Sequence, residues 1–77
     1  MAMILYHFES CPYCVRVRNA VKELGLDLEM RDTREKEAYR EELIVLTGKT
    51  QVPCLVIDGK PMLESADIIN YLKENFG

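Results

Sequence analysis

The sequence predicts a domain of the α/β class, with four strands and three helices in the order βαβαββα. Two observations support this prediction. The spacing of apolar residues switches along the chain between a strand and a helix period, and glycines stand where the helical patterns stop. A strand–helix–strand opening implies two parallel strands joined by a right-handed crossover, and a closing hairpin adds antiparallel strands. We therefore expect a four-stranded mixed sheet with helices on both faces.

The chain opens on a strand and a helix. Residues 3–8 (MILYHF) are apolar on both sides, as in a strand that is covered on both faces of a sheet. Residues 12–24 carry apolar side chains at helical spacing, and Gly25 is placed to end this helix in a left-handed turn. Residues 26–31 then alternate apolar and polar side chains, which predicts an edge strand.

A second helix is expected after this strand. Asp32 with Glu35 three residues later resembles a capping box, although that motif usually begins with Ser or Thr. Apolar residues at helical spacing continue to Leu46, and Gly48 is placed to stop the helix. The spacing puts Leu46 on the buried stripe of this helix.

The last third of the chain predicts a hairpin followed by a helix. Residues 52–57 form a third apolar run, and Asp58-Gly59 can turn the chain back into residues 61–63. Ser65 can then cap a last helix. The expected buried stripe of that helix consists of Ile68, Ile69, Leu72 and Phe76.

The composition is that of a single soluble domain, which we expect to span residues 1–77. Apolar residues make up 48% and charged residues 30%, an ordinary globular balance. The formal charge is −3, with acids and bases interspersed and no basic block, which argues against nucleic-acid binding. No apolar run approaches the ~18 residues of a membrane span. With an odd number of cysteines and no export leader, we expect a cytoplasmic protein. We also expect a monomer that holds no metal.

Two thiols three residues apart, Cys11 and Cys14, stand where the first strand gives way to the first helix. Unpaired backbone N–H groups and the helix dipole favour a thiolate at such a position, and the thiolate is the nucleophile of disulfide exchange. Pro12 fits the first helical turn, where its missing N–H costs nothing. Cys11 is therefore the candidate nucleophile at an exposed helix tip. Cys14 falls on the apolar stripe and is the candidate resolving thiol.

Two structural uses of this pair are weaker. Zinc usually needs four ligands, and the soft ligands of this chain are Cys11, Cys14, Cys54 and His7, without a second closely spaced ligand pair. A static disulfide would close a very short loop and would restrict the unfolded chain little. Redox use is thus the stronger prediction, and Cys54 is expected to be a buried apolar residue.

The first strand also carries two aromatic side chains with polar groups, Tyr6 and His7. Tyr6 is expected in the core with its hydroxyl at a polar edge. His7 is expected to be structural, because disulfide exchange needs no separate base once Cys11 is ionised.

This order of elements, with Cys-Pro-Tyr-Cys at 11–14 and Val52-Pro53 before the third strand, resembles the glutaredoxin family of the thioredoxin fold. The resemblance covers essentially the whole chain. It implies a thioredoxin fold and a glutathione-dependent thiol–disulfide oxidoreductase with catalytic Cys11 and Cys14. Glutathione would be the co-substrate, with no tightly bound cofactor. The protein partners would be glutathionylated or disulfide-containing proteins.

The resemblance also implies a binding site for glutathione. Pro53 would be cis, and the main chain of Val52 would pair with the cysteinyl residue of the tripeptide. Around Glu64, Ser65 and Asp67, helix N–H groups and an acidic side chain would hold the γ-glutamyl group. The alternative is that Ser65 only caps the helix and Asp67 only favours its dipole.

Three further residues complete the implied site. Tyr13 would flank the cysteinyl group, and Gln51 stands where the family usually has threonine. Arg40 matches the position of a cation for the glycyl carboxylate. Its alternative role is that of a solvated arginine on a helix face, paired with Glu37.

The sequence departs from the family pattern beside the cysteines and near the last helix. Phe8 stands where many glutaredoxins carry lysine, and Glu9 adds a negative charge. Both changes should weaken glutathione binding unless Lys49 or Arg40 compensates. The pair Glu64-Ser65 is closer to the N-terminal domain of glutathione transferases.

Three other functions remain as alternatives. The first is a glutaredoxin-like dimer that binds an iron–sulfur cluster through Cys11 and glutathione. The second is a transferase-like domain, suggested by Glu64-Ser65. The third is a thioredoxin-like electron donor that a reductase reduces without glutathione, which Phe8 makes credible.

Overall fold

The computed structural model describes residues 2–77, and its elements follow the predicted order. The strands are β1 (Met3–His7), β2 (Glu29–Asp32), β3 (Cys54–Ile57) and β4 (Lys60–Met62). The helices are α1 (Pro12–Glu23), α2 (Glu37–Thr47) and α3 (Ser65–Phe76). The strands form one four-stranded sheet in the order β2-β1-β3-β4. β1 is parallel to β2 and antiparallel to β3, which is antiparallel to β4, so the predicted mixed sheet is confirmed.

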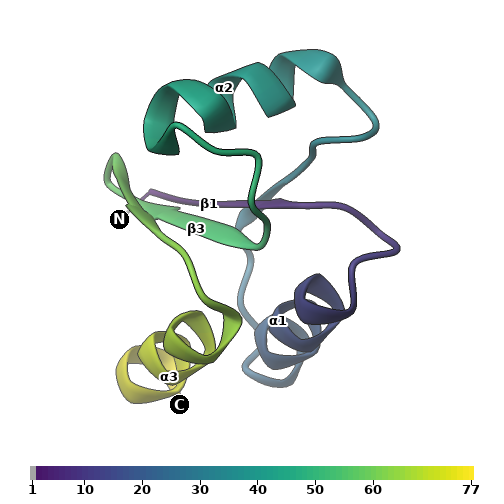
Figure 1. The fold of residues 1–77 in the computed structure, drawn as a ribbon. Helices are drawn as coiled ribbons and strands as arrows, with labels where there is room; N and C mark the ends of the chain where they lie inside the picture. The colour runs from purple at the N-terminus through teal and green to yellow at the C-terminus, as the bar shows by residue number, and fades with distance from the viewer. Residues whose placement is uncertain (1) are drawn as a thin grey trace.

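The sheet separates two helical layers. Helix α2 lies on one face, and α1 and α3 lie on the other (Figure 1). Successive side chains of a strand point to opposite faces, so Leu5 of β1 packs with α1 and α3 while Tyr6 packs with α2. Among the described residues, no helix has the length and apolar character needed to cross a bilayer.

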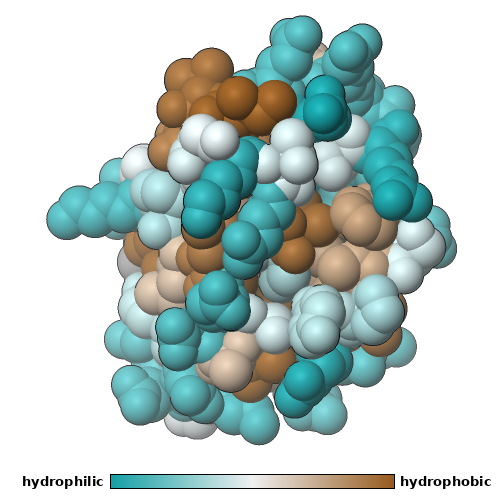
Figure 2. All heavy atoms as spheres, viewed as in Figure 1, coloured by the Kyte–Doolittle hydropathy of each residue, from teal (hydrophilic) through white to brown (hydrophobic). Residues whose placement is uncertain are grey.

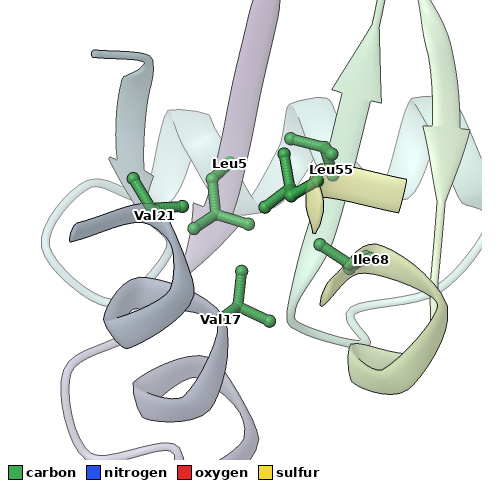
Figure 3. Packing of buried hydrophobic residues seen from close by; sticks show 6 residues of the cluster. Leu5, Val17, Val21, Leu55 and Ile68 are labelled. Carbon is green, nitrogen blue, oxygen red and sulfur yellow. The ribbon is translucent and has the colours of Figure 1, made fainter. Parts of the chain in front are cut away.

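The face toward α1 and α3 holds the larger core, which we call the aliphatic cluster. Its side chains come from β1, α1, β3 and α3 and point toward one another (Figure 3). Burying one such side chain contributes roughly 1.5–3 kcal/mol, so this cluster is the main source of stability. It consists of Leu5, Val17, Val21, Leu55, Ile68 and Leu72.

The face toward α2 holds a smaller core, the tyrosine cluster, formed by Tyr6, Leu43, Cys54 and Val56. The Tyr6 hydroxyl donates to Glu42 Oε1 at 2.8 Å, as expected of a buried tyrosine whose tip reaches a polar edge. This cluster is therefore closed on one side by polar groups.

Helix α1 ends as the sequence predicts. Gly25 has a φ of 64° and donates its N–H to Lys22 O, while Leu26 N–H donates to Val21 O, which makes a Schellman motif. Because residue 26 closes the helix, β2 begins only at Glu29 and not at the predicted residue 26. The strand does lie at an edge of the sheet.

The predicted starts of the other two helices are wrong. Asp32 Oδ1 accepts the N–H groups of Arg34 at 2.8 Å and Glu35 at 3.1 Å, but these bonds stabilise a turn, and α2 begins at residue 37. Glu64 precedes α3 with a φ of 68°, and Ser65 is already the first helical residue with no side-chain cap. A hydrogen-bonded turn decides the first boundary and the left-handed backbone of Glu64 marks the second, and the hydrophobic period reports neither.

The remaining differences concern strand ends and burial. β1 ends one residue early, at His7, β3 begins at Cys54, and β4 is shifted to residues 60–62. Leu46 is 38% exposed, so its predicted place on a buried stripe is wrong. In α3 the buried residues are Ile68 and Leu72, while Ile69 and Phe76 pack at the margin of the aliphatic cluster.

Candidate active site

Cys11 lies between β1 and α1, at the N-cap position of α1 with Pro12 following it. Its carbonyl accepts the first helical hydrogen bond, from Val15 N–H at 3.0 Å, and its own N–H donates to Phe8 O at 3.3 Å. The residue is only 6% exposed, so the predicted exposed tip is wrong. A helix wheel describes residues inside the helix, whereas Cys11 precedes it in a turn that folds back on Phe8.

Cys14 is fully buried in the first turn of α1, as the apolar stripe predicts. Burial raises the pKa of its thiol to about 12, and a hydrogen bond with the Cys11 side chain adds to this effect. A backbone hydrogen bond of Phe8 and the charge of Arg18 act in the opposite direction. All three cysteines are free thiols, and Cys14 is held in the protonated form at neutral pH.

Arg18, one turn further along α1, holds the loop that carries Cys11. Its Nη1 donates to His7 Nδ1 at 3.0 Å and to Phe8 O at 3.2 Å, and its Nη2 donates to Glu9 O at 3.0 Å. Because a guanidinium only donates, His7 Nδ1 must be unprotonated. Burial and the Arg18 charge both lower the pKa of His7. The sequence analysis did not predict this role, because the helical spacing puts Arg18 on a solvent-facing side of α1.

A groove of about 330 Å³ lies at the start of α3 and the end of the loop before β3. The Val52–Pro53 peptide bond is cis, as the resemblance implied. Gln51 Nε2 donates to Glu64 Oε1 at 3.5 Å. All the lining residues are predicted substrate-binding residues: Tyr13, Gln51, Val52, Pro53, Glu64 and Ser65.

Two predicted binding residues lie outside the lining of this groove. Asp67 is exposed in the first turn of α3. Arg40 lines a separate pocket of about 170 Å³ together with Phe8, Thr33, Arg34 and Thr50. The structure therefore places Arg40 in a different hollow from Tyr13 and Val52.

Arg34 in this second pocket was missed by the sequence analysis. Its guanidinium carbon lies 3.9 Å from the centre of the Phe8 ring, and its Nη1 donates to Ser10 Oγ at 3.2 Å. The parallel pairing of β1 and β2 aligns His7 with Asp32, so the residues that follow the two strands meet at one sheet edge. That topology was predicted, and it was the available signal that Phe8 and Arg34 would be neighbours.

Cys54 packs away from the other two cysteines, in the tyrosine cluster on the α2 face. Burial raises the pKa of its thiol to about 11, so it serves as a buried apolar residue, as expected. The Cys3His zinc set would require this thiol on the α1 face. Within residues 2–77 no three His, Cys, Asp or Glu side chains gather as a candidate metal site.

Comparisons with known proteins find relatives of two kinds, glutathione S-transferases and glutaredoxins. The family model for the glutathione S-transferase N-terminal domain matches residues 5–77. A glutaredoxin of Haemophilus influenzae is 31% identical, with 100% of this chain covering 97% of that protein. Glutathione S-transferase U22 of Arabidopsis thaliana is also 31% identical, with 94% of this chain covering 33% of that protein.

Solved structures agree with this result. The chain superposes on glutathione S-transferase isozyme E7 from Drosophila melanogaster with a TM-score of 0.81 and 32% identity, over 97% of this chain and 35% of that one. The chain thus spans about a third of the length of the transferases and almost the full length of the glutaredoxin. The thioredoxin-like fold is confirmed, and the chain belongs to the family of glutathione S-transferase N-terminal domains, with glutaredoxins as well as transferases among its relatives.

Proposed function

We propose that this protein is a glutathione-dependent thiol–disulfide oxidoreductase of the glutaredoxin type. The observation that carries the proposal is a free Cys11 at the start of α1, next to the 330 Å³ groove in sequence. Tyr13, two residues after Cys11, lines this groove together with cis-Pro53. A full-length glutaredoxin relative supports it. Glutathione is the co-substrate, and glutathionylated or disulfide-containing proteins are the partners.

The first half of the reaction transfers glutathione to the enzyme. The Cys11 thiolate attacks the glutathione sulfur of a mixed disulfide, and a new bond forms between Cys11 Sγ and that sulfur. The old S–S bond breaks, and the released protein thiolate takes a proton from solvent. Val52 would pair its main chain with the cysteinyl residue, and Tyr13 would flank that residue. Ser65 and Glu64 would hold the γ-glutamyl end.

The second half returns the enzyme to its reduced form. A second glutathione thiolate attacks the glutathione sulfur of the adduct, which forms glutathione disulfide and regenerates the Cys11 thiolate. The net reaction converts the mixed disulfide and one added glutathione into the free protein thiol and glutathione disulfide. The added glutathione is therefore the reductant. Glutaredoxin couples lie near −200 to −230 mV, close to the cytosolic glutathione poise, so this reduction is feasible.

Cys14 supports a second route, for protein disulfides. There its thiolate attacks Cys11 Sγ in the enzyme–substrate disulfide, closes the Cys11–Cys14 bond and releases the reduced protein, and two glutathiones then reopen that bond. Because burial raises the pKa of Cys14 to about 12, little of it is thiolate at neutral pH. We therefore expect glutathione, and not Cys14, to resolve the Cys11–glutathione adduct.

Turnover of a glutathionylated peptide, with glutathione as the sole reductant, tests the proposal. Cys11→Ser should abolish turnover because the nucleophile is lost. Cys14→Ser should keep removal of glutathione from the peptide and lose reduction of a protein disulfide. Cys54→Ser, on the opposite face of the sheet, is the matched thiol control and should affect neither reaction. Full activity of Cys11→Ser would overturn the mechanism.

Three further measurements on the purified protein distinguish the other candidate functions. The family match and the Glu64-Ser65 segment favour a transferase role as the second candidate, and conjugation of glutathione to a chlorinated aromatic acceptor would support it. Turnover with a reductase and not with glutathione would instead indicate a thioredoxin-like donor. A brown colour after anaerobic purification would indicate a bound iron–sulfur cluster. We propose a cytoplasmic location, since free thiols persist in a reducing compartment. A monomer is a separate part of the proposal.

A further inference from the structure

Helix α2 exposes apolar side chains at its C-terminal end. Val45 is 86% exposed, and its neighbours Ile44 and Leu46 are each 38% exposed. Leu43 is fully buried, and each further residue turns by about 100° around the helix, so the next three residues lie on its outer sides. Figure 2 shows hydrophobic atoms gathered over this end of α2. Much of this apolar surface is therefore not used by the core.

The exposed side chains border a hollow of about 560 Å³ that is open to solvent. The sheet contributes Tyr6 and Arg31 to its lining, and α2 contributes Val45 and Leu46 together with two glutamates. Its volume lies within the roughly 300–1,000 Å³ that binding sites usually span. Because the hollow is open along α2, it suits a segment of another molecule that lies beside the helix.

A row of acidic residues extends the apolar end of α2 toward its N-terminus. Glu37, Glu41 and Val45 are four residues apart and exposed, so they lie on one line along the outer side of the helix. Within residues 2–77 neither of these two glutamates has a salt-bridge partner. Like charges at this spacing destabilise a helix slightly, so a cation placed beside them would stabilise it.

The nearby arginines are engaged elsewhere. Arg31 forms ion pairs with Glu29 and Glu42, and Arg40 lines the separate 170 Å³ pocket. The last turn of α2 carries no basic residue, although the partial negative charge at the C-terminal end of a helix favours one. The acidic row and the hollow, which we together call the α2 surface, therefore combine apolar contact area with uncompensated negative charge.

We propose that the α2 surface is a docking site for a cationic amphipathic segment of a partner protein. Apolar side chains of this segment fill the hollow beside Val45 and Leu46, and a lysine or arginine pairs with Glu41. Charge complementarity favours this occupant over a second copy of the chain, because a two-fold interface would bring the acidic row of both copies together.

Docking at this surface leaves the cysteines accessible. Helix α2 covers the face of the sheet opposite to α1, whose first turn carries Cys14 (Figure 1). The docked segment therefore belongs to a partner that the protein holds while its active site stays open. The inference stands apart from the proposed function, because it rests on the charge and exposure of α2 alone.

Selection from a phage library of random short peptides tests the proposal. Wild-type protein is the target, and Val45→Ser protein is used to remove peptides that bind elsewhere. The enriched peptides should combine bulky apolar residues with lysine or arginine. Enrichment of acidic or uncharged peptides would overturn the proposal, and so would a failure to enrich any peptide that distinguishes the two targets.

The strongest selected peptide is then measured by calorimetry on matched variants. Val45→Ser should weaken binding about tenfold, because the peptide no longer buries an apolar side chain. Glu41→Gln should weaken binding roughly threefold and reduce its dependence on salt. The controls are exposed residues on the other face, Val15→Ser in α1 and Glu74→Gln in α3, and both should leave the affinity unchanged. Equal losses in the controls would overturn the site.

Two further measurements separate the alternatives. Sedimentation velocity should show no dimer that Val45→Ser dissociates, and such a dimer would assign the surface to a second copy and overturn the proposal. The selected peptide should leave turnover of a glutathionylated substrate unchanged, and inhibition would place it at the active site instead. If the protein without peptide shows no turnover, the oxidoreductase function fails while the peptide measurements still decide the α2 surface.

Discussion

The two faces of the sheet are built differently. The α1 and α3 face is closed by two helices over the aliphatic cluster, and it carries Cys14. The α2 face is closed by one helix over the smaller tyrosine cluster, beside an open hollow of about 560 Å³ lined in part by Tyr6, Val45 and Leu46. Figure 2 shows hydrophobic side chains gathered over α2 at the surface, and Val45 there is 86% exposed.

On each face an arginine makes several side-chain hydrogen bonds at the polar margin. Arg18 binds His7 and the backbone of the cysteine loop, so its hydrogen bonds act on the reactive segment. Arg31 binds the Tyr6 hydroxyl and forms ion pairs with Glu42 and Glu29, so its bonds close the tyrosine cluster. The contrast indicates that the α1 and α3 face holds the cysteine loop in place, while the α2 face contributes mainly to the stability of the sheet.

The largest expected effect compares two fully buried leucines on opposite faces. Leu72→Ala in α3 should destabilise the protein toward the upper end of the roughly 2–5 kcal/mol range for such cavities. The loss of stability for Leu43→Ala in α2 should lie toward the lower end of this range. The open hollow beside α2 lets the neighbouring side chains close over the cavity or lets water enter it. Urea unfolding followed by circular dichroism measures both. An equal or larger loss for Leu43→Ala would show that the α2 face is packed as tightly as the other.

The next effect should appear in activity. Arg18→Met removes the hydrogen bonds to His7, Phe8 and Glu9 and should lower kcat/KM for a glutathionylated peptide by about tenfold or more, because the Cys11 loop is no longer fixed. Arg31→Met, its counterpart on the α2 face, should leave kcat/KM nearly unchanged and lower stability instead. If both variants lost activity equally, the division of roles between the faces would be wrong.

A smaller effect tests the polar margin of the tyrosine cluster. Tyr6→Phe removes the 2.8 Å hydrogen bond to Glu42 and keeps the ring in place. The expected loss is about 1 kcal/mol, which corresponds to a decrease in Tm of roughly 4–8 °C for a domain of this size. Differential scanning calorimetry gives the value, and turnover should not change. No change in Tm would mean that water replaces the bond fully.

The hydrophobic period predicted the element order and the edge strand, because it is a local property of the sequence. The cis proline and the residues that line the 330 Å³ groove were implied only by the resemblance to glutaredoxins. The sequence analysis missed the burial of Cys11 and the start of α2, which depend on hydrogen-bonded turns, and the start of α3, which follows the left-handed backbone of Glu64. Arg18 and Arg34 were missed for a related reason. Both look like surface charges, and their roles arise only when strand pairing brings distant loops together.

The last and smallest effect is a difference in the pH at which the two faces lose stability. Burial, and then Arg18, lowers the pKa of His7 from 6.5, with Asp32, Glu9 and Glu35 acting weakly in the opposite direction. The unfolded chain therefore binds more protons at His7 just below pH 6.5, so stability should fall as the pH drops below 6.5 and level off below the folded pKa.

The α2 face should respond at lower pH. Hydrogen bonds from Tyr6 and Arg31 lower the pKa of Glu42 from 4.5, so its contribution is present above pH 4.5 and is lost as the pH falls through the folded pKa. His7→Asn keeps an acceptor for Arg18 and cannot titrate, so the fall in Tm that begins near pH 6.5 should disappear while the fall below pH 4.5 remains. Glu42→Gln should show the reverse pattern. If His7→Asn kept the wild-type profile, His7 would not be the group through which the cysteine-bearing face senses pH.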